Sequence, residues 1–151
     1  MSRPFQRIGS VSNAHVGRAF ELAAQRYFSQ QGLDLNLGHT VDVGIGANKK
    51  PHKFDLGCSK QKIIVECKSH RWTISHNVPS AKLTTWNEAM YYFHAAPSNY
   101  RKIMFVLKDI RHENGESLAH HYLRTYGHLI PADVELWEYD VSADNAAPVC
   151  A

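Results

Sequence analysis

Hydrophobic residues recur with a helical period in three segments of the chain and alternate or run together in the segments between them. From about Asn13 to Gln31, Val16, Phe20 and Ala23 fall on one arc of a helix that Gly32 can end. Residues 80–96 and 116–126 predict two further helices, and Pro97 stops the first of these two. The pattern therefore predicts a protein with three helices.

The intervening segments predict strands. Residues 35–45 and 53–57 form two of them, joined by a basic connection, and residues 62–68 form a third. Residues 101–108 are apolar on both faces, which is typical of a central strand, whereas the acids in 134–139 predict an edge strand. A strand, helix, strand passage requires a parallel crossover, so we expect an α/β fold: an αβββαβ core with a central mixed sheet flanked by helices, plus a C-terminal helix and strand.

The length of 151 residues predicts a single domain, with an N-terminal arm at 1–12 and an unstructured tail at 140–151. No apolar run approaches the roughly 20 residues of a membrane span, and no apolar segment follows the basic residues near Met1. The three cysteines match neither a disulfide framework nor a zinc-site spacing. We expect a cytoplasmic protein that does not act in a membrane.

Charge is unevenly distributed along the chain. Residues 1–82 contain 12 Lys and Arg against 5 Asp and Glu, a net charge of +7, whereas residues 83–151 contain 5 against 9, a net charge of −4. The basic excess peaks at five lysines, which are the pattern expected of a surface that faces phosphates: Lys49, Lys50, Lys53, Lys60 and Lys62. A solvated lysine-rich loop is the alternative interpretation.

Three charged residues lie in predicted strands, where folding alone does not explain them. Asp55 lies between Phe54 and Leu56 in a predicted strand, where Asp is rare. Glu66 and Lys68 project from one face of the next strand, with about 7 Å between their Cα atoms. Two strand carboxylates can hold Mg²⁺ or Mn²⁺, and a neighbouring lysine can position or deprotonate a water or stabilise transition-state charge. We expect both carboxylates to be open to solvent.

Asp55, a gap of ten residues and then Glu66-Cys67-Lys68 resemble the motif of the PD-(D/E)XK nucleases, the restriction endonuclease-like superfamily that includes Holliday-junction resolvases. The predicted element order also resembles the core of that superfamily. Phe54 stands where the proline of the motif would be. The resemblance covers about residues 14–108 and leaves 109–139 as a C-terminal extension of a single nuclease-like domain.

The resemblance implies a Mg²⁺-dependent endonuclease that hydrolyses DNA. It implies that Glu21, on the first helix, joins Asp55 and Glu66 as a metal ligand, and that the backbone carbonyl of Cys67 faces the metal. Lys68 would then be the catalytic lysine. Superfamily members that cut both strands act as homodimers, so the resemblance also allows a homodimer here. Besides the lysine-rich segment, four residues follow the motif and are candidates for DNA contacts by charge and stacking: His70, Arg71, Trp72 and His76.

Two other function classes stay open at this stage. One is a non-catalytic nucleic-acid-binding domain that keeps the nuclease fold, and the other is a protein-interaction domain whose acidic C-terminal half meets a partner. Salt-dependent retention of DNA separates the second from the nucleic-acid-binding hypotheses, and metal-dependent cleavage separates an enzyme from a binding domain. The sequence does not distinguish DNA from RNA as substrate.

Overall fold

The computed structural model describes residues 13–150, so the predicted arm at 1–12 and Ala151 lie outside the described residues. Within these described residues, three helices and six strands follow one another, with one short 3₁₀ helix: α1 (Asn13–Gln30), β1 (Asn36–Val43), β2 (Lys50–Cys58), β3 (Ile63–Lys68), α2 (Ser80–Ala95), β4 (Arg101–Leu107), α3 (Leu118–Tyr126), η1 (Gly127–Leu129), β5 (Val134–Asp140) and β6 (Asn145–Pro148). No helix in this part of the chain is long and apolar enough to cross a membrane.

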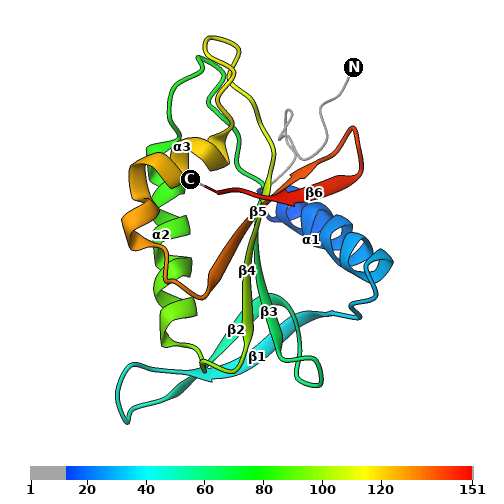
Figure 1. Cartoon of the computed structure of the whole chain (residues 1–151), viewed down its shortest axis with the longest axis vertical. Helices are drawn as coiled ribbons and strands as arrows, with labels where there is room; N and C mark the ends of the chain where they lie inside the picture. The colour runs from blue at the N-terminus through cyan, green and yellow to red at the C-terminus, as the bar shows by residue number, and fades with distance from the viewer. Residues whose placement is uncertain (1–12, 151) are drawn as a thin grey trace.

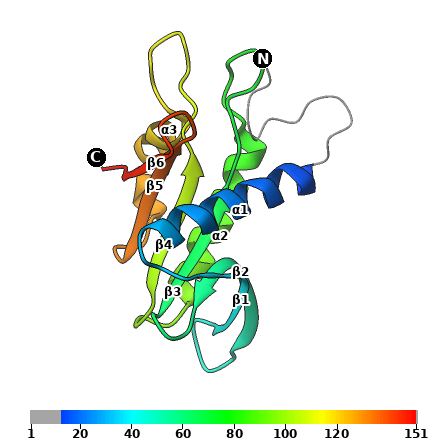
Figure 2. The same ribbon diagram turned by 90° about the vertical axis from the view of Figure 1, so that its right-hand side faces the viewer.

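The six strands form one mixed sheet in the order β1-β2-β3-β4-β5-β6. Strands β3, β4 and β5 run parallel, while β1, β2 and β6 are antiparallel to their neighbours. Helix α1 covers one face of the sheet, and α2 with α3 covers the other (Figure 1). Turned so that α1 faces the viewer, the molecule shows this helix crossing the sheet (Figure 2). The predicted α/β class, the mixed sheet and its flanking helices are confirmed.

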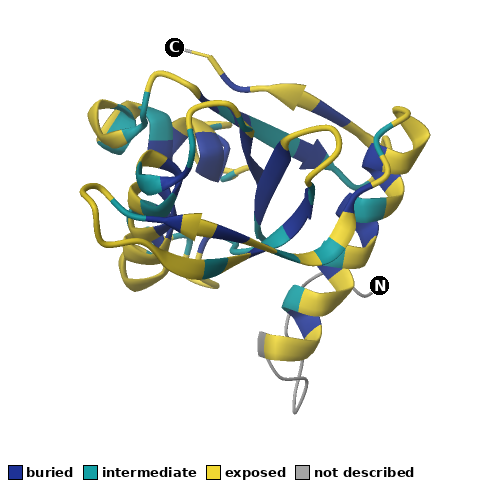
Figure 3. Cartoon of the chain, turned by 90° about the horizontal axis from the view of Figure 1, so that it is seen from below, coloured by how far each residue is buried: buried dark blue, intermediate teal, exposed yellow. Residues whose placement is uncertain are grey.

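Each face of the sheet has its own hydrophobic core. On the α1 face, Phe20 and Tyr27 pack against Phe105 of β4, with ring centroids 5.8 and 5.7 Å apart. On the opposite face, Trp86 and Phe93 of α2 join Ile64 of β3. The middle of the sheet is accordingly buried and the outer surfaces of the helices are exposed (Figure 3). Strand β3 contributes to both cores, which fixes the side on which each of its polar residues emerges.

The prediction of an unstructured tail at 140–151 is wrong for the described part of that segment. Strand β6 pairs with β5 in antiparallel register, so β5 is not the sheet edge that its acids predicted. The connecting turn is closed by side chains: Asp140 Oδ1 accepts the Ser142 N–H at 3.0 Å, and the Tyr139 hydroxyl donates to Asp144 at 2.6 Å. Pairing with β5, rather than any strong β-pattern of its own, holds this last segment in the sheet.

Two element boundaries also differ from the sequence predictions. Strand β2 begins at Lys50, so Lys50 and Pro51 lie in the strand and not in the predicted basic connection. Helix α3 begins at Leu118, because the Ser117 hydroxyl caps it by accepting the His120 N–H. Glu116 lies before the helix and instead pairs with Arg124 at 2.9 Å.

Candidate functional site

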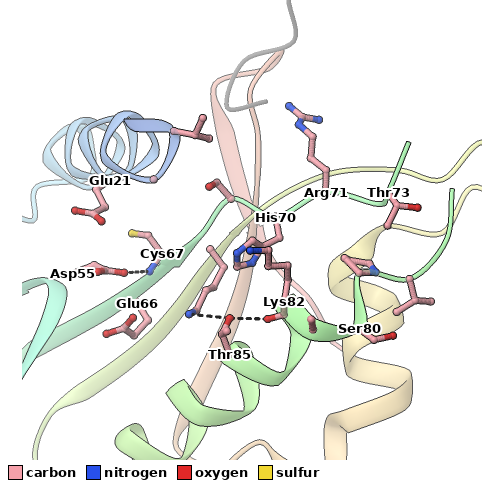
Figure 4. A pocket seen from close by; sticks show the side chains of 17 residues that line it. Glu21, Asp55, Glu66, Cys67, His70, Arg71, Thr73, Ser80, Lys82 and Thr85 are labelled. Atoms are coloured by element: carbon pink, nitrogen blue, oxygen red, sulfur yellow. Dashed lines mark hydrogen bonds between the residues drawn. The ribbon is translucent and has the colours of Figure 1, made fainter. Parts of the chain in front are cut away.

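A cleft of about 830 Å³ lies where the carboxyl end of β3 meets α1 and the start of α2 (Figure 4). The carboxylates of Glu21, Asp55 and Glu66 gather at one end of this cleft, each from a different element. Cys67 and Lys68 line it from β3, and Arg71 lines it from the segment that follows. The structure thus brings together all four predicted catalytic residues, which are separated by up to 47 positions in the sequence.

The pairing of β2 with β3 places Asp55 beside Glu66. The antiparallel ladder ends with Leu56 opposite Val65, so Asp55 and Glu66 are the next residues along the two strands, and their carboxylates interact. Asp55 Oδ2 accepts the backbone N–H of Cys67 at 2.8 Å. This bond satisfies one oxygen of Asp55, orients its carboxylate toward β3 and accounts for an Asp inside a strand.

Glu21 approaches the pair from α1, where it stands at the edge of the helix face that packs on the sheet. Burial, and then the charge of Asp55, raise the pKa of Glu21, whereas Arg18 and Lys53 act in the opposite direction. Lys53 reaches this region across Gly38, which lies on β1 beside Asp55 and has no Cβ to block the lysine stem. Of the five predicted DNA-binding lysines, Lys53 is therefore the one whose charge acts on the cleft.

Glu66 is the most buried of the three acids, contrary to the expectation that both strand carboxylates are open to solvent. It is 9% exposed, and burial together with the neighbouring Asp55 raises its pKa to about 7. The His52 imidazole, 3.9 Å from the Glu66 carboxylate, opposes the shift. The His52 ring is itself held by stacking on Tyr92, with centroids 3.7 Å apart. An acid of this kind favours a nearby cation, because its charge is otherwise poorly solvated.

Lys68 is directed along α2. Its ammonium donates to the Thr85 hydroxyl at 3.5 Å, and Thr85 in turn donates to the carbonyl oxygen of Lys82 at 2.6 Å. The charge of Lys68 also lowers the pKa of Glu66, which shows that the ammonium acts on the acidic end. The lysine therefore stands at the border between the carboxylates and the rest of the cleft.

The donor chemistry of the acidic end fits a hard divalent cation. Three carboxylates are oxygen donors of the type that Mg²⁺ and Mn²⁺ prefer, and their mutual repulsion is what a cation between them would relieve. Within residues 13–150, no three His, Cys, Asp or Glu side chains already stand as close together as the ligands of one bound ion. Burial raises the pKa of the Cys67 thiol well above its usual value, so only the backbone carbonyl of Cys67 is a candidate ligand.

The structure separates the other predicted DNA-binding lysines from this cleft. Lys49 and Lys50 lie at the β1–β2 hairpin, where the Lys49 ammonium donates to the Gly44 carbonyl oxygen at 2.6 Å. Lys60 and Lys62 lie in the β2–β3 turn, at the opposite end of β3 from Glu66. At about 3.3 Å per residue, Lys62 is about 13 Å along the strand from Glu66. The sequence cluster is thus two groups of lysines, one at each end of β2.

Arg71 and Trp72 are fixed by Asp109, on the segment after β4. Asp109 accepts hydrogen bonds from the Arg71 guanidinium and the Trp72 backbone N–H, both at 2.9 Å. The Trp72 indole donates to the Asp109 carbonyl oxygen at 3.0 Å, and the ring is only 7% exposed. Trp72 therefore joins two loops and is not available to stack on a base, whereas Arg71 lines the cleft.

Two residues of the site, Lys82 and Thr85, were missed from the sequence as chemical candidates. His70 Nδ1 accepts the Trp86 indole N–H at 2.8 Å, and Lys82 lies near His70, since its charge lowers the pKa of that imidazole. Only the helical spacing of Lys82 and Thr85, three residues apart, was a sequence signal that these two share a face of α2. Nothing in the linear pattern indicates that this face meets β3.

His70 gives a testable dependence of stability on pH. Burial, and then Lys68 and Lys82, lower the pKa of His70 from 6.5 to about 4. The unfolded chain therefore binds a proton that the folded chain does not, and stability falls as the pH drops from about 6.5 to about 4. Because the ring is partly exposed, we expect a loss of about 1–2 kcal/mol.

Urea unfolding across that pH range checks this expectation. His70→Asn keeps an oxygen that can accept the Trp86 N–H but does not titrate, so the fall attributable to His70 should vanish. The pH dependence that Glu66 contributes is common to both proteins and cancels in the comparison. Identical pH profiles for the two proteins would contradict the assignment.

Comparisons of the chain with protein-family models, with curated proteins and with solved structures find no match.

Proposed function

We propose that this protein is a Mg²⁺- or Mn²⁺-dependent nuclease that hydrolyses phosphodiester bonds in DNA. The observation that carries the proposal is the convergence of three carboxylates from three elements with a lysine at the end of one open cleft. The αβββαβ order and the mixed sheet support the proposed restriction endonuclease-like fold. The hydrogen bond to the Cys67 N–H explains an acceptor at position 55, but it does not explain a second carboxylate beside it, because Asp55 makes ionisation of the buried Glu66 more costly.

Each residue has a role that follows from its surroundings. Glu21, Asp55 and Glu66 would hold the cation, with the Cys67 carbonyl as a further oxygen ligand. When bound, the cation supplies Lewis-acid polarisation of the phosphoryl group and acidification of a water. Lys68, held by Thr85, would position that water or stabilise the negative charge that develops on the phosphoryl oxygens. Lys53 and Arg71 would attract the nucleic acid backbone into the cleft.

Incubation of the purified chain with a panel of nucleic acids tests the proposal. Supercoiled, linear, single-stranded and branched DNA, and RNA of the same sequences, are each treated with Mg²⁺, Mn²⁺ or chelator. We expect cleavage of DNA that depends on the divalent ion. Nicked product from supercoiled DNA would indicate single sites acting separately, whereas direct linear product would indicate the paired sites of a homodimer.

Three results would overturn or redirect the proposal. Salt-sensitive DNA binding without cleavage under any of these conditions would support the non-catalytic nucleic-acid-binding alternative. No retention of any nucleic acid at low salt would leave the protein-interaction alternative. Cleavage of RNA alone would keep the chemistry and change the substrate class.

A further inference from the structure

The cleft continues past Lys68, and its second end is basic. Lys82 and His70 line it beside the hydroxyl-bearing residues Thr73 and Ser80 (Figure 4). Lys82 begins the α2 face that also carries Thr85, the hydrogen-bond partner of Lys68, so the basic end starts directly next to the proposed catalytic lysine. Acidic and basic groups are therefore segregated along one continuous cleft.

The protonation of His70 is fixed by its neighbour. An indole N–H can only donate, so the bond from Trp86 requires His70 Nδ1 to be an acceptor. The ring is then neutral and carries its proton on Nε2. Trp86 is fully buried in the core, which holds the imidazole in place. His70 thus offers the cleft a neutral, oriented hydrogen-bond donor beside the ammonium of Lys82.

We propose that Lys82 and His70 Nε2 form a phosphate-binding subsite that holds the backbone phosphate next to the scissile phosphodiester on the same strand. The proposal rests on the function proposed above and deepens it. An ammonium and an oriented N–H donor are complementary to phosphate oxygens, and the acidic end of the cleft cannot serve this purpose, because it would repel them. The strand would then pass along the start of α2, away from the lysines of the β1–β2 hairpin and the β2–β3 turn.

Substitution of Lys82 and substitution of His70 should change the affinity for DNA and its salt dependence in different ways. Lys82 neutralises a phosphate and so releases counterions, whereas a neutral His70 does not. For a single strand, Lys82→Ala should reduce the slope of log K against log salt by about 0.7. His70→Asn, which keeps an acceptor for Trp86, should weaken binding about tenfold without changing that slope, since it removes a hydrogen bond to a charged group.

Fluorescence anisotropy with a labelled single-stranded DNA of about eight nucleotides, short enough to occupy one cleft, measures both quantities. The full chain is titrated over a range of KCl, once with chelator and once with Ca²⁺ in place of Mg²⁺. Lys60→Ala is the matched control, because it removes the same charge from the β2–β3 turn and should leave affinity and slope unchanged. Folding of each variant is checked by circular dichroism.

Each outcome supports or overturns the subsite. The expected result is a lower slope for Lys82→Ala, an unchanged slope with weaker binding for His70→Asn, and parent behaviour for Lys60→Ala. The subsite is overturned if Lys82→Ala keeps the parent slope, if Lys60→Ala changes it equally, or if the parent chain does not bind the probe. Mg²⁺-dependent cleavage is assayed on the same preparations. Cleavage with an unaffected Lys82→Ala slope rejects the subsite alone, and the expected slopes without cleavage reject the nuclease proposal alone.

Discussion

Lys68→Ala is expected to lower the rate of DNA cleavage at saturating DNA and Mg²⁺ by about 10²-fold or more, since removal of one transition-state donor has effects of this size. An ammonium has no lone pair and is no ligand for Mg²⁺, so the variant should keep its metal affinity. The side chain is held at the cleft by Thr85 and contributes to neither hydrophobic core, so folding should be unaffected. Single-turnover cleavage and calorimetric titration with Mg²⁺ measure the two quantities.

The matched control for this variant is Lys60→Ala, which removes an equal charge from the opposite end of β3. It should cleave at the parent rate. A Lys68→Ala protein that cuts as fast as the parent would show that the lysine has no catalytic role, even if the carboxylates bind metal. A parallel loss in both variants would indicate a general effect of positive charge on DNA binding.

Glu66→Gln is expected to stabilise the metal-free protein above pH 7 and to abolish its response to Mg²⁺. Folding raises the pKa of Glu66 from 4.5 to about 7, so the folded state binds this proton more tightly than the unfolded state. The stabilisation of the folded state by protonated Glu66 is therefore lost as the pH rises from 4.5 to about 7, and it stays lost above that pH. At about 1.4 kcal/mol per unit, the buried carboxylate costs on the order of 3 kcal/mol, which a neutral amide of the same shape would avoid.

Thermal and urea unfolding with chelator and with Mg²⁺ check this expectation. The parent should gain about 2.7 kcal/mol at a Mg²⁺ concentration 100 times its Kd, because the ion binds only the folded state. Glu66→Gln should start from a higher stability and gain nothing. A Gln variant that is less stable than the parent in chelator, or equally stabilised by Mg²⁺, would contradict the interpretation of Glu66 as a desolvated metal ligand.

The sequence predicted the elements that have strong local patterns. The helical arc around Phe20 and the doubly apolar run of β4 each correspond to an observed element. The alternation in β3 placed Ile64 and Val65 on opposite faces, and they belong to opposite cores. These correct predictions have one physical basis. When a face of an element is buried, its apolar residues recur every 3.6 positions in a helix or every 2.0 positions in a strand.

The sequence could not predict features that depend on pairing between distant segments. Strand β6 contains Asn145 and Pro148 and has no strand pattern, yet β5 offers it an open edge. The aromatic ring of Trp72 is typical of a stacking surface, but Asp109, 37 positions away, fixes it inside the molecule. Lys82 likewise has no signal in the linear order, because only the approach of α2 to the end of β3 makes it a neighbour of His70.

The cleavage of DNA by the parent chain and by Asp55→Asn, purified in parallel and assayed over a range of Mg²⁺ concentrations, tests the nuclease proposal most directly. Asn keeps an oxygen that can accept the Cys67 N–H, so the variant should fold, but it removes the charge that would hold the cation. We predict that parent cleavage saturates with Mg²⁺ and stops in chelator, and that Asp55→Asn does not cleave. Cleavage that is equal in the two proteins, or that persists in chelator, would contradict the proposed metal site.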